Sequence, residues 1–429
     1  MRSARRLAPA LLVLVLAVVS ACSTGGLSAT TVTATKTAGQ SSAAVPDSTG
    51  TSSGQSSGSS SSASSAAPTT TITQPPVAAV TASPAFGATD ISPVEPISIS
   101  VAQGTIDSLV MTNPEGKEVA GTVAADKASW AVGEELGFGK TYTVTGTATG
   151  TDGKQVPISG TYATVQPTDE VRTTVNPGDG QIVGVAAPIS VSFGVEPEDR
   201  ALIQKNVTVS TDPVVEGAWA WLKHDDGRWA MDWRPKEYWP ANTRVHVEVN
   251  VYGLKFADGA YGAQDLTSDF SIGRNQVVKA DVNSFEMVVQ QNGVTVATYP
   301  ASYGKGEAGG DPNLITRSGI HVVNEFNEVK LMNNPRYGYT NSPQKWAVRI
   351  SNNGEFIHAN PNSVGSQGSS NVTHGCINLS TEHAEEYFKG ALWGDPVEIT
   401  GTSVNLSAED GDIYDWAIPW DQWLTMSAL

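Results

Sequence analysis

Residues 373–380 read THGCINLS, in which a cysteine lies between a His-Gly pair and a short apolar run. This cysteine, Cys376, has a second histidine, His358, a loop's length upstream, and the only other cysteine of the chain is Cys22. A lone thiol beside two histidines favours nucleophilic catalysis, because a histidine can take the proton of a thiol whose ordinary pKa is about 8.5. Gly375 permits close backbone approach, so that amide N–H groups there can stabilise an oxyanion.

The residues that follow the thiol indicate local structure. Residues 376–379 predict a short strand, and Ser380 is a good N-cap for a helix over residues 381–389, which Gly390 ends. In an extended segment Asn378 faces the same side as the thiol, where its side chain can orient a histidine or a substrate amide.

Two β-hairpins are predicted upstream of the thiol. Residues 285–299 read FEMVVQQNGVTVATY, in which two alternating runs flank Asn-Gly, the pair that a type I′ turn prefers. Residues 346–358 repeat this pattern around Asn353 and Gly354, and the returning strand ends at His358. Histidine and thiol therefore both lie at the edges of regular elements, where a scaffold can hold them beside a cleft.

The first half of the chain contains an internal repeat. Residues 96–101 read PISISV and residues 188–193 read PISVSF, both with the alternation of a half-buried strand. Trp130 and Trp233 follow at corresponding places, and an Asp-Gly turn ends each copy. Two copies of about 90 to 100 residues predict two tandem immunoglobulin-like sandwiches. We expect them to act as a spacer that contributes nothing to the site.

The other histidines and most tryptophans are expected to have no chemical role. We interpret His224 and His246 as surface or packing residues, His321 as a strand residue and His383 as a helix-surface residue. The tryptophans at 219, 221 and 233–239 are expected in the core or between domains rather than on a sugar-binding platform.

The N-terminus resembles a bacterial export signal. Arginines at positions 2, 5 and 6 precede an apolar run over residues 7–19, which is shorter than the roughly 18 to 20 residues of a membrane span. Residues 19–22 read VSAC and resemble a lipobox, which implies lipidation of Cys22 at the outer face of the cytoplasmic membrane. An ordinary cleaved signal is the alternative. Residues 23–76, rich in Ser, Thr, Ala and Gly, predict a flexible tether with an end-to-end distance of about 40 Å.

Composition narrows the class of protein. The chain has 42 glycines, 24 prolines and only 16% charged residues, which together with short Val, Ile and Thr runs favour β-structure. A formal net charge of −17 disfavours nucleic acid as a partner, because phosphate binding needs clustered Lys and Arg.

At the thiol motif the chain resembles the L,D-transpeptidases with a YkuD-type catalytic domain. Their signature is a histidine, a loop of some fifteen residues, and then Ser/Thr-His-Gly-Cys-x-Asn, which His358, residues 359–372 and residues 373–378 match. Further similarity covers YPASYGK at 299–305, SVGSQG at 363–368 and the tail IPWDQW at 418–423.

The resemblance implies a role for each site residue. Cys376 is the nucleophile, and His358 exchanges protons with it while the backbone carbonyl of Ala359 orients the ring. The other expected site residues shape the surroundings of the nucleophile (His374, Gly375, Asn378) or line the cleft (Tyr339, Asn353, Gly354). Tyr337 competes with Tyr339 for its place, and Asn362 stands where close relatives are expected to carry an aromatic residue.

The resemblance implies 3-3 cross-linking of peptidoglycan through a Cys376 thioester. Donor and acceptor tetrapeptide stems are the expected substrates, carbapenem-type β-lactams the expected covalent inhibitors, and the lipid on Cys22 the link to the membrane. An L,D-carboxypeptidase with water as acceptor and a non-catalytic wall-binding module are the alternatives. No cofactor is expected. Zinc held by His358, His374 and Cys376 is disfavoured, because no second cysteine or acidic ligand accompanies them.

The predicted fold class is mainly β, with two immunoglobulin-like β-sandwiches followed by a YkuD-type β-sandwich that carries one or two short helices. The predicted segments are a signal peptide (1–22), a tether (23–76), two immunoglobulin-like domains (77–168 and 169–274), a catalytic domain (275–402) and an extension packing on the catalytic domain (403–429).

Overall fold

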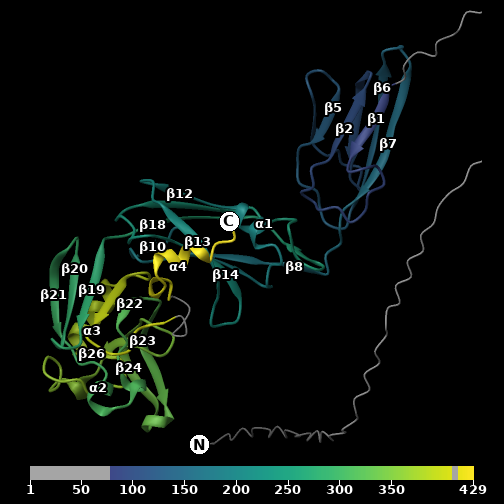
Figure 1. The fold of residues 1–429 in the computed structure, drawn as a ribbon. Helices are drawn as coiled ribbons and strands as arrows, with labels where there is room; N and C mark the ends of the chain where they lie inside the picture. Colours follow the sequence, from purple (N-terminus) through teal and green to yellow (C-terminus); the bar gives the residue numbers. More distant parts are fainter. Residues whose placement is uncertain (1–77, 408–413) are drawn as a thin grey trace, which may run out of the picture. The chain divides into compact units, whose positions relative to one another are not determined.

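The computed structural model describes residues 78–407 and 414–429 (Figure 1). The predicted signal peptide, the tether and Cys22 lie outside these residues. Strands dominate the described part, so the mainly β fold class is confirmed. No helix in this part of the chain is both long and apolar enough to cross a membrane.

The first β-unit consists of two antiparallel sheets. One has the strand order β1-β2-β5-β4 and the other the order β3-β6-β7. Their bounds are β1 Ala79–Ser83, β2 Ser98–Ala102, β3 Gly104–Thr112, β4 Gly121–Val123, β5 Ser129–Val132, β6 Thr141–Gly150 and β7 Gln155–Ala163. The core of this unit packs alternate residues of both sheets around Trp130, Tyr142 and Tyr162.

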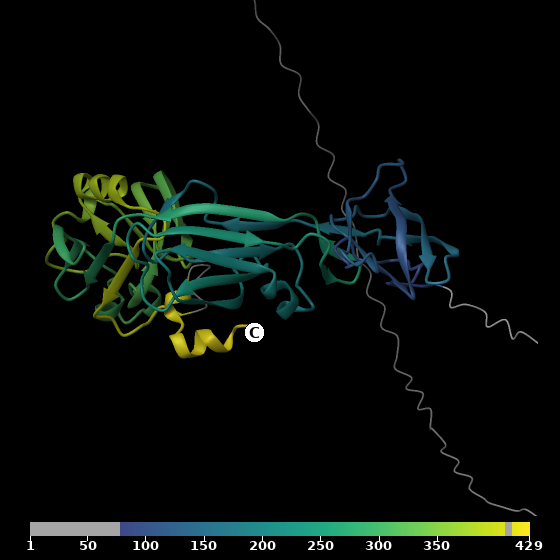
Figure 2. The same ribbon diagram turned by 90° about the horizontal axis from the view of Figure 1, so that it is seen from above.

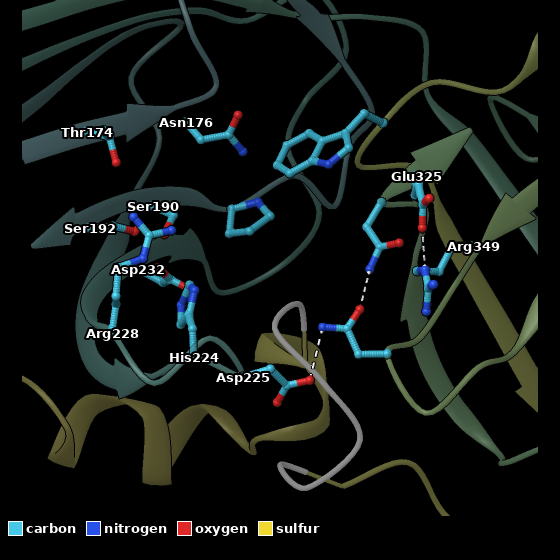
Figure 3. A pocket seen from close by; sticks show the side chains of 14 residues that line it. Thr174, Asn176, Ser190, Ser192, His224, Asp225, Arg228, Asp232, Glu325 and Arg349 are labelled. Atoms are coloured by element: carbon cyan, nitrogen blue, oxygen red, sulfur yellow. Dashed lines mark hydrogen bonds and ion pairs between the residues drawn. The ribbon is translucent and has the colours of Figure 1, made fainter. Parts of the chain in front are cut away.

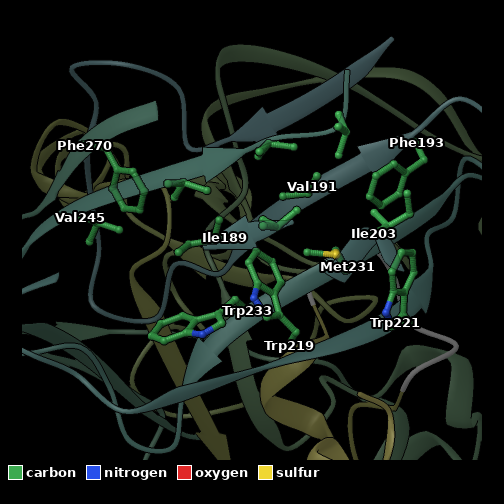
Figure 4. Packing of buried hydrophobic residues seen from close by; sticks show 14 of the residues in the cluster. Ile189, Val191, Phe193, Ile203, Trp219, Trp221, Met231, Trp233, Val245 and Phe270 are labelled. Atoms are coloured by element: carbon green, nitrogen blue, oxygen red, sulfur yellow. The ribbon is translucent and has the colours of Figure 1, made fainter. Parts of the chain in front are cut away.

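The second β-unit has the strand orders β13-β14-β11-β9 and β10-β18-β15-β12, with a small sheet β16-β17-β8. The bounds are β8 Asp169–Val171, β9 Thr173–Asn176, β10 Ile182–Val183, β11 Ile189–Phe193, α1 Arg200–Lys205, β12 Val207–Asp212, β13 Gly217–Lys223, β14 Trp229–Pro235, β15 Arg244–Val249, β16 Lys255–Ala257, β17 Ala260–Gly262 and β18 Leu266–Ile272. Figure 4 shows its core, in which the tryptophans at 219, 221, 233 and 239 are buried as expected.

The two copies share a structural arrangement that is offset by two residues from the sequence repeat, because the repeat matches Ile189 with Ile97 and the structure matches it with Ile99. Ile99 pairs with Trp130 across β2 and β5, and Ile189 pairs with Trp233 across β11 and β14. In both units the next strand presents a glycine to the indole, since a Cβ on Gly121 or on Gly217 would lie 2.1 Å from the ring. Only glycine leaves room for the buried tryptophan there.

The third β-unit positions the thiol. Its sheets have the orders β21-β20-β19-β27-β22 and β23-β24-β25-β26. The bounds are β19 Gln276–Asp281, β20 Glu286–Gln291, β21 Val294–Pro300, α2 Gly306–Gly309, β22 Gly319–Val322, β23 Glu325–Asn334, β24 Tyr339–Arg349, β25 Phe356–Ala359, β26 Ile377–Leu379, α3 Thr381–Gly390 and β27 Pro396–Thr400. The two sheets share one core with α3, which contacts β24 and β25. Helices α2 and α3 agree with the predicted one or two short helices.

The turn and the helix start that the sequence predicted around this core are present in the structure. The β20–β21 hairpin turns at Asn292 and Gly293, whose φ angles are 50° and 76°, which confirms the predicted turn. Ser380 caps α3 by accepting a hydrogen bond from the N–H of His383. The predicted stop at Gly390 is wrong by one residue, because Gly390 is still helical and the chain leaves the helix in an extended conformation at Ala391.

The C-terminal extension was expected to pack on the catalytic domain, and this prediction is largely wrong. Its helix α4 (Trp420–Thr425) lies along the second β-unit instead, beside β13 (Figure 2). Trp423 is fully buried against Ala220 and Leu222, and its indole N–H donates to Ala218. The start of the extension pairs with Ser318, just before β22, and the turn at residues 415–417 contacts β22 of the third β-unit.

Arg234 explains why the extension binds where it does. This buried guanidinium lies 4.6 Å from the ring of Trp416, 5.1 Å from that of Trp420 and 4.7 Å from that of Trp423, and it donates to the carbonyl of Ile418. A desolvated arginine among aromatic faces is a specific docking point.

We expect Trp423→Ala to lower the free energy of unfolding by about 3 to 5 kcal/mol, because it empties a fully buried site. Urea unfolding followed by tryptophan fluorescence measures this loss. Leu424→Ala is the matched control, since Leu424 is the next residue and 48% exposed. Equal unfolding midpoints for the two variants would contradict the packing of α4.

Candidate active site

Cys376 lines a cavity of about 260 Å³ on the third β-unit, which is called the catalytic unit below. The lining residues are Met332, Tyr339, Ser342, Gln344, His358, Asn360, Asn362, Val372, Thr373, His374, Cys376 and Asn378. The structure therefore brings together the predicted thiol, both predicted histidines, Tyr339 and Asn378.

Two adjacent parallel strands position the thiol and the histidine. β25 pairs with β26 so that His358 lies opposite Asn378, and Cys376 directly precedes β26. Every residue of both strands is buried. The backbone ladder therefore holds the base and the nucleophile on one rigid support.

Two threonines fix the loop that carries the nucleophile. The hydroxyl of Thr373 donates to the carbonyl of Cys376 at 2.7 Å, and that of Thr316 donates to the carbonyl of Gly375 at 2.8 Å. Gly375 has a φ of +119°, a conformation that side chains rarely adopt. Sequence reasoning missed both roles, and for Thr316 no local signal marks it.

That backbone N–H groups near Gly375 stabilise an oxyanion stays a prediction, and the N–H of Gly375 itself is engaged within the loop. Its N–H donates to the hydroxyl of Thr373 at 3.2 Å. Gly375 therefore serves the backbone turn rather than the cavity.

The Cys376 sulfur is accessible from the cavity but closely surrounded by protein. Its Sγ lies 3.6 Å from the carbonyl oxygen of Gly354, to which the thiol donates. Burial raises the pKa of the thiol to about 12, and the negative charge of Glu355 acts in the same direction. The backbone N–H of Phe356 and the charge of Arg349 oppose this increase in the pKa. The empty site therefore holds a neutral thiol.

His358 is also neutral in the empty site. Burial lowers its pKa to about 4, although the hydrogen bond to Ala359 acts in the opposite direction. Nδ1 lies 2.9 Å from the carbonyl oxygen of Ala359, as the sequence resemblance implied. Because a carbonyl only accepts, Nδ1 carries the proton and Nε2 carries a lone pair that can accept one.

His374 is positioned by stacking on two aromatic rings. Its ring stacks on Tyr337 at 5.1 Å and on Tyr339 at 5.5 Å between centroids. Both tyrosines therefore contact the histidine, but only Tyr339 lines the cavity. Partial burial and the charge of Lys305 lower the pKa of His374.

Asn378 offers an acceptor to a bound molecule. Its Nδ2 donates to the hydroxyl of Ser363 at 3.3 Å, while its buried Oδ1 has no hydrogen-bond partner among the described residues. A substrate N–H would satisfy this oxygen. Asn353 and Gly354 are not among the lining residues, and Gly354 reaches the thiol only through its carbonyl.

The remaining histidines lie outside this cavity. His321 is fully buried in β22, and His383 stacks on Tyr299 at 4.9 Å rather than facing solvent. His224 contacts Asp232 at 3.0 Å, and His246 contacts Asp269 at 2.8 Å. Within the described ranges no group of three or more His, Cys, Asp and Glu residues is arranged to hold a metal ion.

A larger cavity of about 640 Å³ lies between the second β-unit and the catalytic unit (Figure 3). It is lined by serine, threonine, asparagine and charged side chains, among them the Glu325–Arg349 ion pair, and it contains no thiol. The smaller cavity is the candidate active site, because only there do a nucleophile and a base meet.

The chain is similar to known proteins over most of its length. Residues 275–399 match the family model for the L,D-transpeptidase catalytic domain, and residues 88–255 match the model for a bacterial Ig domain. L,D-transpeptidase 5 of Mycobacterium tuberculosis is 49% identical over 355 residues, which cover 83% of this chain and 78% of that protein. L,D-transpeptidase 2 of the same organism is 35% identical over 355 residues, 81% of this chain and 84% of that protein. An L,D-transpeptidase structure in complex with imipenem is 32% identical and has a TM-score of 0.45, covering 55% of this chain and 100% of its own.

The pKa values of about 12 and about 4 predict that the thiol and the imidazole are both neutral from about pH 5 to about pH 11. We therefore expect alkylation of native Cys376 by iodoacetamide, measured in a Cys22→Ala protein, to keep rising with pH beyond about pH 9. The same protein unfolded in urea is the control and should titrate near the ordinary thiol value of about 8.5. A native plateau reached below about pH 8 would instead indicate a preformed thiolate–imidazolium pair.

Proposed function

Since the chain belongs to the L,D-transpeptidase family, we propose that it is a cysteine acyltransferase that forms 3-3 cross-links between diaminopimelate residues of peptidoglycan stems. The observation that carries this proposal is the shared cavity, which both the Cys376 thiol and the imidazole of His358, with its unprotonated Nε2, line. A thiol and a neutral base in one cavity are suited to acyl transfer.

In the first half-reaction the thiol attacks the carbonyl carbon that follows the L-centre of diaminopimelate in a tetrapeptide stem. His358 takes the thiol proton as the S–C bond forms, and then gives it to the nitrogen of the departing D-alanine. The products are D-alanine and a Cys376 thioester. Because both groups start neutral, the proton transfer accompanies the attack rather than preceding it.

In the second half-reaction the side-chain amine of a second stem attacks the thioester carbonyl. His358 accepts a proton from this amine and returns it to the departing sulfur, so the free thiol is regenerated and the site is ready for another turnover.

The other lining residues bind and orient the stem. The buried Oδ1 of Asn378 accepts a substrate N–H, and the stacked pair of His374 and Tyr339 shapes the wall beside the nucleophile. Asn362 lines the mouth as a small amide, which affects the fine preference for stems and inhibitors.

The remaining parts of the chain fit a protein that works in the cell wall. We propose that residues 1–22 direct export, that Cys22 is lipidated at the outer face of the cytoplasmic membrane, and that residues 23–76 tether the folded part. Carbapenems are proposed as covalent inhibitors that acylate Cys376, because a strained β-lactam carbonyl can take the place of the stem carbonyl.

Cys376→Ala should abolish the covalent adduct with a carbapenem, because it removes the attacking sulfur. Intact-protein mass spectrometry after incubation with imipenem measures the adduct. Cys22→Ala is the matched control and should still gain one inhibitor mass. An adduct on the Cys376→Ala protein would disprove the assignment of the nucleophile.

His358→Ala should slow carbapenem acylation by about two to four orders of magnitude, the usual loss when a proton-transfer group is removed. Stopped-flow fluorescence gives the rate. His383→Ala is the control, since that histidine lies on α3 and does not line the cavity. Equal acylation rates for His358→Ala and the wild-type protein would indicate that His374, rather than His358, transfers the proton.

A further inference from the structure

Beneath the nucleophile lies a buried carboxylate that the proposed reaction does not use. Glu355 is 3% exposed and stands between Gly354 and β25. We propose that Glu355 is a positioning residue for the nucleophile, which clamps the turn over residues 351–355 to β22 and thereby holds the Gly354 carbonyl against the Cys376 sulfur. This inference rests on the proposed role of Cys376 as the nucleophile.

Both carboxylate oxygens of Glu355 have partners from different parts of the chain. Oε1 accepts from the backbone N–H of Arg317 at 2.9 Å and lies 3.7 Å from its guanidinium. Oε2 accepts from the hydroxyl of Ser351 at 2.8 Å and lies 3.6 Å from Nδ1 of His321. Charge-assisted hydrogen bonds of this kind are the stronger ones in a buried setting.

His321 adds a further contact to this cluster. Its Nε2 lies 2.9 Å from the carbonyl oxygen of Arg317 and its Nδ1 lies 3.2 Å from that of Ile350. Because Nδ1 also lies beside the Glu355 carboxylate, the fully buried ring connects the residues before β22 with the turn that follows β24.

The cluster joins the two sheets of the catalytic unit directly below the thiol. His321 lies in β22, the last strand of the five-stranded sheet, whereas Ser351 and Glu355 flank the turn from β24 to β25 in the four-stranded sheet. The residues on either side of Glu355 face the sulfur, since the carbonyl of Gly354 accepts from the thiol and the N–H of Phe356 favours the thiolate. A shift of this turn therefore moves both groups that contact the sulfur.

The negative charge of Glu355 should affect the pH at which the Cys376 thiolate forms, and this effect can be measured. The charged groups that act on the thiol are Glu355, which disfavours the thiolate, and Arg349, which favours it. The titratable groups that share its cavity are His358, His374 and Tyr339, of which Tyr339 interacts with it electrostatically. Removing the negative charge should make the thiolate form at lower pH. A residue that only supports the fold would not change this titration.

The test compares Glu355→Gln with Glu398→Gln in the full chain carrying Cys22→Ala. Glu398 lies in β27, where it makes an ion pair with Lys279 and accepts a hydrogen bond from Tyr238. We expect Glu355→Gln to slow imipenem acylation by about 10- to 100-fold, the cost of a small misplacement of reacting groups. It should also move the alkylation profile of Cys376 to lower pH, whereas Glu398→Gln should change neither.

Ser351→Ala keeps the proposal testable if Glu355→Gln does not fold. It removes one hydrogen bond of the carboxylate and keeps the charge, so acylation should slow while the alkylation profile stays in place. Folded variants of both residues with wild-type acylation rates and wild-type alkylation profiles would overturn the proposal. If imipenem does not acylate the wild-type protein although iodoacetamide still alkylates Cys376, the proposed function is refuted. The role of Glu355 can then still be measured through the alkylation profile.

Discussion

The site depends on the parallel pairing of β25 with β26. This pairing places His358 opposite Asn378 and brings Cys376 to the start of β26, so that base and nucleophile share one rigid, buried support. The same burial raises the pKa of the thiol and lowers that of the imidazole. Both groups therefore rest in their neutral forms, and the chemistry needs a substrate to draw the proton from sulfur to nitrogen.

Much of the site could be predicted because its signals are local. Asn292-Gly293 specifies a turn and Ser380 specifies a helix start, each through its own backbone preference. The sequence motif that contains His358 and Cys376 predicted that the two lie close together, and both line one cavity. Thr316 could not be found in this way, because its contact with Gly375 joins residues far apart in sequence. The C-terminal extension was recognised by its tail at residues 418–423, but nothing in residues 403–429 indicates that its partner is Arg234 on the second β-unit.

The second β-unit contacts the catalytic unit. Its Asp225 accepts a hydrogen bond from Asn352 at 3.1 Å, within the turn that leads to Gly354 and the thiol. Tyr238 donates to Glu398 at 3.1 Å, and backbone hydrogen bonds join Gly184 to Trp393. These contacts pack the second β-unit against the catalytic unit, but none of the residues that make them lines the cavity of Cys376. That the immunoglobulin-like part stands outside the active site stays a prediction.

The central claim is that this site joins two stems through a Cys376 thioester. The most direct measurement incubates the full chain with a disaccharide-tetrapeptide that contains diaminopimelate and analyses the products by liquid chromatography and mass spectrometry. If a Cys376 thioester joins two stems, we expect dimers linked between two diaminopimelate residues, with one D-alanine released for each link. Stems that stay unchanged, or tripeptides without dimers, would contradict it.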